Sequence, residues 1–367
     1  MSESLWNELE EFWDKENVEE KAEKYQELYE DPKEDSQNVE EFSWVHEKDN
    51  LNAKSQSIAW GIPNHVLGDI DKAKVVVGLL NPGTLITDEE AKEYTTIRGY
   101  IKEELERENS NNQSNEVYLG DSNNKDQLYE FYRNHILSKE NVLSIELKRF
   151  YELYKENPSN LNCLYKNKGE AFSSIAYYLK NYYCHSLSEK GTKYRIAIEH
   201  YRSIFEKMCE VKNVKNDIEK DFEEALSNMS IANIELVPYR SNKGKAIGNI
   251  DGLESSKLSA KILIKKILRD LDTIVILRSL EGWEGLFKIV CEEKGFNFER
   301  DIAPNIYEFK NQNGAISKDN IVPYLSEENE SSKSIDEVID ELGDIISLKD
   351  FETELNKLLK EKNEKEQ

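Results

Sequence analysis

The sequence lacks the features that would place the chain in a membrane or in an oxidising compartment. No apolar run approaches the length needed to cross a bilayer, and the first residues hold no basic segment followed by an apolar stretch. The four cysteines lie far apart, without a CxxC pair or a histidine at metal spacing. We therefore expect a soluble cytoplasmic protein with reduced thiols, no structural zinc and no other metal or cofactor.

Two nucleotide-binding motifs are also missing. Neither GxGxxG nor GxxxxGK[ST] occurs, so a dinucleotide or Walker-type site has no support, and there is no internal repeat. The net charge of −24 argues at first against a nucleic-acid partner, because phosphate binding relies on lysine and arginine. The distribution of that charge changes the conclusion.

Most of the negative charge lies at the two ends of the chain. Residues 1–50 hold 18 acidic residues and 5 lysines, a net of −13, and residues 324–367 hold 14 and 6, a net of −8. The middle keeps 41 acidic and 38 basic residues, a net of −3. This near-neutral middle can bind DNA or a nucleotide through a local basic patch. The acidic ends are solvated helix faces, a cover over a binding cleft, or a surface for a protein partner.

The most informative segment is KVVVGLLNPGT at residues 74–84, an apolar run that stops at Asn81, Pro82 and Gly83. Val and Leu bounded by Pro and Gly are typical of a buried strand in a parallel sheet, and ligands of such sheets gather where the strands end. Pro82 fixes φ, Gly83 permits a close backbone approach, and Asn81 is the polar group at the strand end. The segment predicts a ligand site, with an ordinary β-turn as the alternative.

Two further strands are predicted downstream. They are the apolar runs IANIELVPYRS (231–241) and TIVILRS (273–279), and each is followed by a helix. Ser279 is a candidate N-cap and Gly295 a C-terminal stop for the second helix. Residues 305–309 predict a late edge strand. Strands that alternate with helices predict an α/β fold with a three-layer, mostly parallel sheet.

The remaining segments complete the predicted organisation. The stretch 109–127 is rich in Asn and Ser, which is typical of a loop, and residues 128–228 repeat apolar side chains at helical spacing with Pro158 as the single proline. We expect an acidic N-terminal helical extension (1–50), an α/β core (51–108 and 229–323), a loop and helical insertion (109–228), and an acidic C-terminal helical extension (324–367).

Two strand ends together resemble motifs of the uracil-DNA glycosylase superfamily. Its mismatch-type and single-strand-selective branches have a first motif G-x-N-P-G, which residues 78–83 match with one extra residue between Gly78 and Asn81. A later N-x-x-L-x-P-Y strand end runs from Asn233 to Tyr239. The resemblance covers residues 60–108 and 229–321. It implies a uracil-DNA-glycosylase-like fold and excision of a base from DNA.

The resemblance also implies roles for individual residues. Asn81 would be the catalytic residue that positions or polarises the attacking water, and Asn233 would read the edge of the base. Breaking an N-glycosidic bond needs such a water, an amide at the base edge, and a donor for the anionic leaving base. Arginines at strand ends can fork onto phosphate, or form ordinary salt bridges at the sheet rim. The other candidates for substrate binding are Pro82, Gly83, Tyr239, Arg240, Ser241 and Arg278.

The chain departs from the family at the late motif, usually His-Pro-Ser or Asn-Pro-Ser, because no histidine follows His200. The corresponding stretch, 311–321, offers Asn311, Asn313 and Ser317 as weak substitutes. The leading hypothesis is a nucleobase-recognising protein that excises a uracil-like or modified base from DNA. One alternative is a non-catalytic protein of the same fold that binds nucleic acid, a nucleotide or a protein. Another is a different α/β nucleotide-binding hydrolase or transferase.

Overall fold

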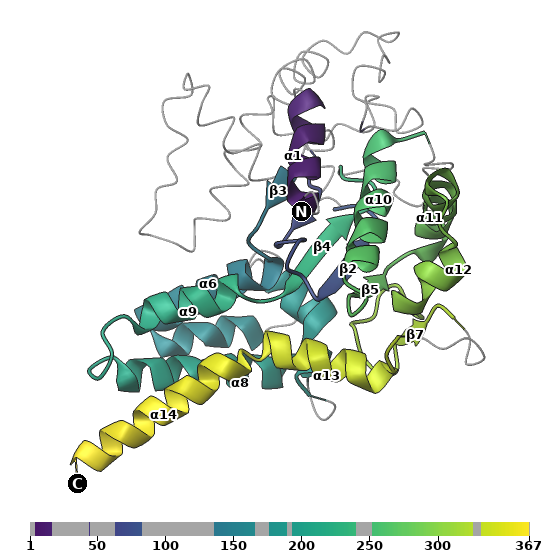
Figure 1. Ribbon diagram of the computed structural model, residues 1–367. Coiled ribbons are helices and arrows are strands. Elements are labelled where there is room, and N and C mark those ends of the chain that lie inside the picture. Colours follow the sequence, from purple (N-terminus) through teal and green to yellow (C-terminus); the bar gives the residue numbers. More distant parts are fainter. Residues whose placement is uncertain are drawn as a thin grey trace, which may run out of the picture. The chain divides into compact units, whose positions relative to one another are not determined.

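The computed structural model describes residues 4–16, 44, 63–82, 136–165, 176–188, 193–239, 252–325 and 332–366. They contain a seven-stranded sheet in the order β3-β1-β4-β2-β5-β6-β7 (Figure 1). The strands are β1 (Val66–Leu67), β2 (Val75–Leu79), β3 (Leu137–Ser138), β4 (Ile231–Glu235), β5 (Ile274–Leu277), β6 (Ile306–Phe309) and β7 (Ile321–Pro323).

The inner strands of the sheet run in the same direction. β2 is parallel to β5, and β5 is parallel to β6. At the carboxyl end of β4, Leu236 N donates to Leu79 O and Val237 N donates to Leu80 O. The donors and the acceptors both move forward along the chain, so β4 runs parallel to β2. β1 pairs antiparallel with β4 and parallel with β3. The predicted α/β fold with a mostly parallel sheet is confirmed, and the ends of β4, β2 and β5 share one edge.

One sequence prediction about the sheet is wrong. The strand expected at 305–309 exists as β6, but it is not an edge strand, because β7 follows it in the strand order. β7 has three residues, and both β1 and β3 have two, so none of these strands is long enough to show a period of two in the sequence.

Two helices cover one face of the sheet and bury its apolar side chains. α10 (Glu254–Arg269) and α11 (Leu280–Lys294) lie side by side in Figure 1. α11 begins after Ser279 and ends at Gly295, as the sequence predicts. Burial of apolar surface between these helices and the strands provides the main stabilisation of this part of the molecule. The core on this face includes Val76, Ile234, Ile262, Leu263, Val275, Leu277, Trp283, Leu286 and Phe287.

The chain divides into two compact units. The first comprises residues 1–139, 232–308 and 324–332, and the second comprises residues 140–231, 309–323 and 333–367. Besides α10 and α11, the first unit holds α1 (Leu5–Glu16), the short α12 (Phe298–Asp301) and η6 (Ala303–Asn305). None of the described helices in either unit is both long and apolar enough to span a bilayer.

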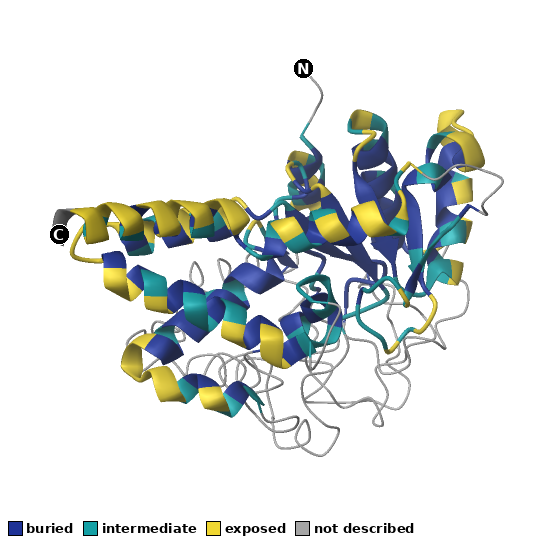
Figure 2. Ribbon diagram, turned by 90° about the horizontal axis from the view of Figure 1, so that it is seen from below, coloured by how far each residue is buried: buried dark blue, intermediate teal, exposed yellow. Residues whose placement is uncertain are grey.

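The second unit is mainly helical, and its C-terminal helix packs along α8. The burial pattern in Figure 2 shows the outward side of α14 exposed and its inward side partly buried. Phe222 of α9 and Phe351 of α14 are in ring contact within this unit. Its elements are α6 (Val142–Glu156), η3 (Pro158–Tyr165), η4 (Leu179–Tyr183), η5 (Cys184–Ser186), α8 (Lys193–Val211), α9 (Ile218–Ser227), α13 (Ile335–Ile346) and α14 (Lys349–Glu366).

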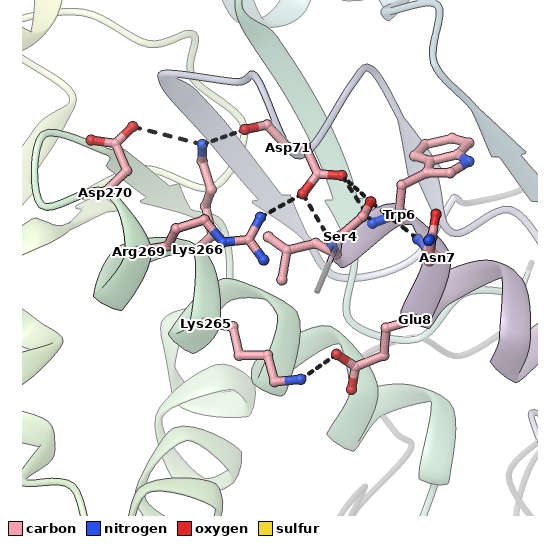
Figure 3. Close-up of polar contacts among 10 residues, drawn as sticks. Ser4, Trp6, Asn7, Glu8, Asp71, Lys265, Lys266, Arg269 and Asp270 are labelled. Atoms are coloured by element: carbon pink, nitrogen blue, oxygen red, sulfur yellow. Dashed lines mark hydrogen bonds and ion pairs between the residues drawn. The ribbon is translucent and has the colours of Figure 1, made fainter. Parts of the chain in front are cut away.

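Asp71, just before β2, anchors the amino end of α1 (Figure 3). Its carboxylate accepts hydrogen bonds from Ser4 Oγ at 2.5 Å, Leu5 N at 2.9 Å and Trp6 N at 3.2 Å, and Arg269 donates to it at 2.6 Å. Burial alone would raise the pKa of this carboxyl, but these donors hold the pKa below its usual value. An anion at a helix N-terminus satisfies N–H groups that have no partner inside the helix.

A second set of charges joins α1 to α10. Glu8 forms ion pairs with Lys261 and Lys265, which lie one turn apart on α10. Figure 3 shows the pair with Lys265. The apolar side of α1 is buried at Leu5, Trp6, Leu9 and Trp13, the residues whose spacing predicts an amphipathic helix. The rest of the predicted 3–30 helix lies outside the described residues.

Candidate functional site

Asn81 and Pro82 follow β2 after one residue, Leu80, and are half-buried, while Gly83 lies outside the described residues. The glycine at the start of the motif has a packing role. A Cβ on Gly78 would lie 2.5 Å from a methyl carbon of Leu277 and 3.1 Å from the indole of Trp283. Gly78 therefore lets α11 approach the strand closely, which is a structural reason for a glycine at this position.

The strand register places Glu235 and Arg278 in one row across the sheet. Leu236 N donates to Leu79 O at 2.9 Å, and Arg278 N donates to Gly78 O at 2.8 Å. The residues just before Leu236 and just after Leu277 are therefore level with Leu79, on the strands that flank β2. Two strand spacings separate the Cα atoms of Glu235 and Arg278 by about 10 Å.

Glu235 and Arg278 also share a face of the sheet. Ile234 and Leu277 belong to the core beneath α10 and α11, and side chains alternate between faces along a strand. Glu235 and Arg278 each follow one of these core residues, so they lie on the opposite face. The Arg278 charge acts on the Glu235 carboxyl.

Glu235 is the most unusual residue of this row because it is a carboxyl group with only 4% of its surface exposed. Its Oε2 atom has no hydrogen-bond partner among the described residues. Burial raises the pKa of Glu235 to about 8, although the Arg278 charge opposes the shift. At neutral pH the group is therefore mainly protonated, and it presents an O–H donor beside a carbonyl acceptor.

Asn233 lies in the interior of β4, opposite Leu67 of β1, and is only 3% exposed. Because Glu235 is level with Leu79, Asn233 is level with Val77 and lies about 13 Å along the strand direction from Asn81. The structure therefore does not bring these two asparagines together. It places Asn233 next to Glu235 on the same face, two residues apart along β4.

Two of the four remaining predicted residues, Tyr239 and Arg278, lie within the described part of the chain. Tyr239 is 1% exposed, forms an isolated bridge with Pro63, and belongs to the apolar core, so its ring is not available for stacking on a base. Arg278 is half-buried at the end of β5. Arg240 and Ser241 lie outside the described residues.

Ser279, between β5 and α11, has a backbone conformation that is uncommon for a residue other than glycine. Its φ is 60° and its ψ 51°, in the left-handed region, and its side chain makes no capping hydrogen bond to α11. Such conformations are costly and occur often at functional sites. The turn places the start of α11 directly after Arg278.

A buried chain of hydrogen bonds supports the end of β4. Trp13 Nε1 donates to His65 Nδ1 at 3.0 Å, so the neutral imidazole carries its proton on Nε2. That nitrogen lies 2.7 Å from Ser259 Oγ, which in turn donates to the carbonyl oxygen of Glu235 at 2.8 Å. Burial lowers the pKa of His65 to about 3. Because His65 is wholly buried, this chain positions β4 and is not itself a reaction centre.

The row of Glu235 and Arg278 was not predicted from the sequence. Its signal was present in IANIE, where two polar residues separated by one apolar residue mark one face of a strand. No described group of three His, Cys, Asp or Glu side chains is arranged to hold a metal ion. Comparison with known proteins finds no matching family model, no similar curated protein and no similar solved structure.

Proposed function

We propose that this protein recognises a nucleobase at the shared carboxyl edge of β4, β2 and β5. The observation that carries the proposal is the buried Glu235, whose Oε2 atom has no hydrogen-bond partner among the described residues, in one row with Arg278. Ligands of parallel sheets bind beyond the carboxyl ends of the strands. A buried carboxyl with an unused oxygen at that position requires a partner, and a polar ligand supplies one.

The chemistry of these groups suits a base. A protonated carboxyl donates and accepts in one plane, as the hydrogen-bonding edges of uracil, guanine or adenine require. The Asn233 amide, on the same face of β4, has the same pair of capabilities. Arg278 contributes a guanidinium, which binds phosphate in a fork geometry. We therefore assign base-edge recognition to Glu235 and Asn233, and phosphate binding to Arg278.

The reaction that we propose is hydrolysis of the N-glycosidic bond of a uracil-like or modified base in DNA, on a uracil-DNA-glycosylase-like fold. Asn81, at the end of β2, would orient the attacking water. The proton of Glu235 would stabilise the negative charge that develops on the leaving base. Support for this reaction comes from the resemblance of residues 78–83 and 233–239 to the glycosylase motifs, and from the buried carboxyl at the same edge.

The second candidate function is binding of a base or nucleotide without hydrolysis. In the 311–321 segment, where the family's late motif would lie, the side chains of Asn311 and Asn320 form hydrogen bonds within the loop itself. Asn320 Nδ2 donates to Ala315 O at 2.9 Å, Asn320 Oδ1 accepts from Asn311 N at 2.9 Å, and Asn311 Oδ1 accepts from Asn313 N at 3.0 Å. Groups committed to a turn are not available to a leaving base, which favours binding alone.

Calorimetric titration with the five common nucleobases and their nucleoside monophosphates tests the proposal. Glu235→Leu removes the donor and the acceptor and should abolish binding, whereas Glu235→Gln keeps both and should bind. Glu308→Leu is the matched control, because Glu308 is paired with Leu277 in the same sheet and so belongs to the opposite face. If the wild type binds no base or nucleotide, or if Glu235→Leu and Glu308→Leu behave alike, the proposal is wrong.

Hydrolysis is tested separately with uracil-containing single- and double-stranded oligonucleotides at excess enzyme. If Asn81 orients the water, Asn81→Ala should abolish base release and leave binding largely intact. Base binding by the wild type without release from any tested substrate would select the second candidate.

A further inference from the structure

The amino end of α10 has no side chain that caps it. Leu253 occupies the N-cap position in an extended conformation, and its apolar side chain offers no hydrogen bond. Lys257 N donates to Leu253 O at 3.0 Å, so the N–H groups of residues 254–256 come before the first bond of the helical pattern. At α1 the carboxylate of Asp71 accepts from N–H groups of this kind. The uncapped end of α10 therefore favours an anion.

Two buried hydroxyls in the same turn point to a ligand. Ser255 and Ser256 are fully buried, and their Oγ atoms have no hydrogen-bond partner among the described residues. A serine inside a helix can bond to a carbonyl oxygen of the preceding turn, as Ser259 Oγ does with Ser255 O at 3.1 Å. Because the Cα–Cβ bonds of a helix tilt toward its N-terminus, the two hydroxyls lie toward the open end of α10. Buried hydroxyls without a partner require one, and a ligand with oxygen acceptors supplies it.

The amino end of α10 lies at the carboxyl edge of the sheet. Ser259 Oγ also donates to Glu235 O at 2.8 Å, which places Ser259 at the last residue of β4. The helix returns from β4 to β5, and both strands are parallel to β2, so α10 runs in the opposite direction. Ser255 and Ser256 precede Ser259 by about one turn and lie about 5 Å beyond the end of β4. Ligands of parallel sheets bind beyond this edge.

Exposed residues show that solvent reaches this end of the helix. Gly252 is exposed, and apart from its chain neighbours no atom lies within 4 Å of the position that a Cβ would occupy on it. Glu254 is exposed as well, and its carboxylate pairs with Lys257 at 3.3 Å, which offsets its charge. In the sequence, residues 240–251 between β4 and α10 hold three basic residues and one acidic residue. The charge of this connection also favours an anion.

We propose that the amino end of α10 binds a phosphoryl group. Its oxygen atoms accept hydrogen bonds from the hydroxyls of Ser255 and Ser256 and from the N–H groups of residues 254–256, and we call this set the α10 phosphate site. All of these groups donate and the backbone groups cannot accept, which suits an oxyanion better than the edge of a base. The inference goes beyond the base site, because Glu235 and Arg278 lie on the other face of the sheet.

Calorimetric titration of the full chain with inorganic phosphate, at an ionic strength held constant with chloride, tests the α10 phosphate site. Ser255→Ala/Ser256→Ala removes both hydroxyls and keeps the helix with its N–H groups. This variant should bind phosphate at least tenfold more weakly than the wild type, because hydrogen bonds to a charged acceptor are the strong ones. The control Ser159→Ala/Ser227→Ala removes two hydroxyls from exposed positions and should bind phosphate like the wild type.

Thermal unfolding without phosphate separates a binding role of the hydroxyls from a structural one. Because the two hydroxyls have no partner among the described residues, Ser255→Ala/Ser256→Ala should unfold at the same temperature as the wild type or at a higher one. Excess phosphate should raise the unfolding temperature of the wild type and of the control, and it should leave that of Ser255→Ala/Ser256→Ala unchanged.

A nucleoside monophosphate identifies the source of the phosphoryl group. If it binds the wild type more tightly than inorganic phosphate does, and Ser255→Ala/Ser256→Ala weakens the binding of both, the phosphoryl group belongs to a nucleotide. If the substitution weakens the binding of inorganic phosphate alone, the site takes free phosphate. Glu235→Leu should bind inorganic phosphate as the wild type does, so failure of the base site leaves this inference intact.

Three results would overturn the inference. The first is a wild type that does not bind inorganic phosphate at about 10 mM, which is the result expected if a buried water satisfies the two hydroxyls. The second is equal phosphate affinity of Ser255→Ala/Ser256→Ala and the control. The third is a lower unfolding temperature of Ser255→Ala/Ser256→Ala without phosphate, because the hydroxyls then stabilise the fold itself.

Discussion

Replacing Asp71 with alanine should detach the amino end of α1 from the sheet. The change leaves Leu5 N, Trp6 N and the Ser4 hydroxyl without their common acceptor, and it removes the charge partner of Arg269. Loss of a capping acceptor costs about 1 kcal/mol, and loss of a half-exposed ion pair costs up to about 1 kcal/mol. We therefore expect the free energy of unfolding of the first unit to fall by about 2 kcal/mol.

Urea unfolding followed by tryptophan fluorescence measures this loss, because all five tryptophans belong to the first unit. Asp14→Ala is the matched control, since Asp14 is an exposed aspartate on the same helix. Hydrogen exchange of residues 4–16 should accelerate in Asp71→Ala alone. The reasoning is refuted if the two variants unfold within about 0.5 kcal/mol of each other, the range typical of surface substitutions.

The remaining predictions concern packing and protonation in the first unit. Gly78→Ala should lower the free energy of unfolding by about 1–3 kcal/mol, because the added Cβ would collide with Leu277. Gly285→Ala should not destabilise the protein, because the space around Gly285 is open. The unfolding temperatures of the two variants test this difference. Trp13→Phe should cost about 1–3 kcal/mol by leaving His65 Nδ1 buried without a donor, and an unchanged urea midpoint would contradict this. Because the pKa of His65 is lowered to about 3, its contribution to stability is present above about pH 6.5 and is lost as the pH falls toward 3. Urea midpoints across that range should show this loss in the wild type but not in His65→Gln.

The strands and helices of the first unit were largely predictable where local signals are strong. β2 and β5 are apolar runs bounded by polar or turn residues, and α11 carries a capping position at Ser279 and a glycine stop at Gly295. The left-handed conformation of Ser279 was not predictable, because serine is also an ordinary N-cap in extended conformation. The short β1 and β3 form only through pairing with distant segments, which no local pattern encodes.

The candidate site was predictable in position but not in composition. The carboxyl edge of β2 follows from its apolar run and the Asn-Pro-Gly ending, and Asn81 lies there. Asn233 looked like a strand-end residue, yet β4 continues to Glu235, and the hydrogen bonds of Leu236 and Val237 set the register that separates the two asparagines. Register depends on partner strands, so a single sequence does not reveal that Glu235 and Arg278 share a row.

The central claim is that Glu235 recognises a base with a protonated carboxyl, and the pH dependence of binding tests it most directly. Burial raises the pKa of Glu235 in the folded protein to about 8, so its proton is bound below that pH and lost above it. Calorimetry from about pH 6 to about pH 9.5 measures the affinity for the best-bound base or nucleotide. The affinity should stay constant below about pH 8 and should decrease above it, approaching a tenfold loss for each further pH unit. Glu235→Gln, which does not titrate, should bind with an affinity that stays level over the same range. A wild-type affinity that stays level above pH 8, or a Glu235→Gln variant that loses affinity in parallel with the wild type, would contradict the account.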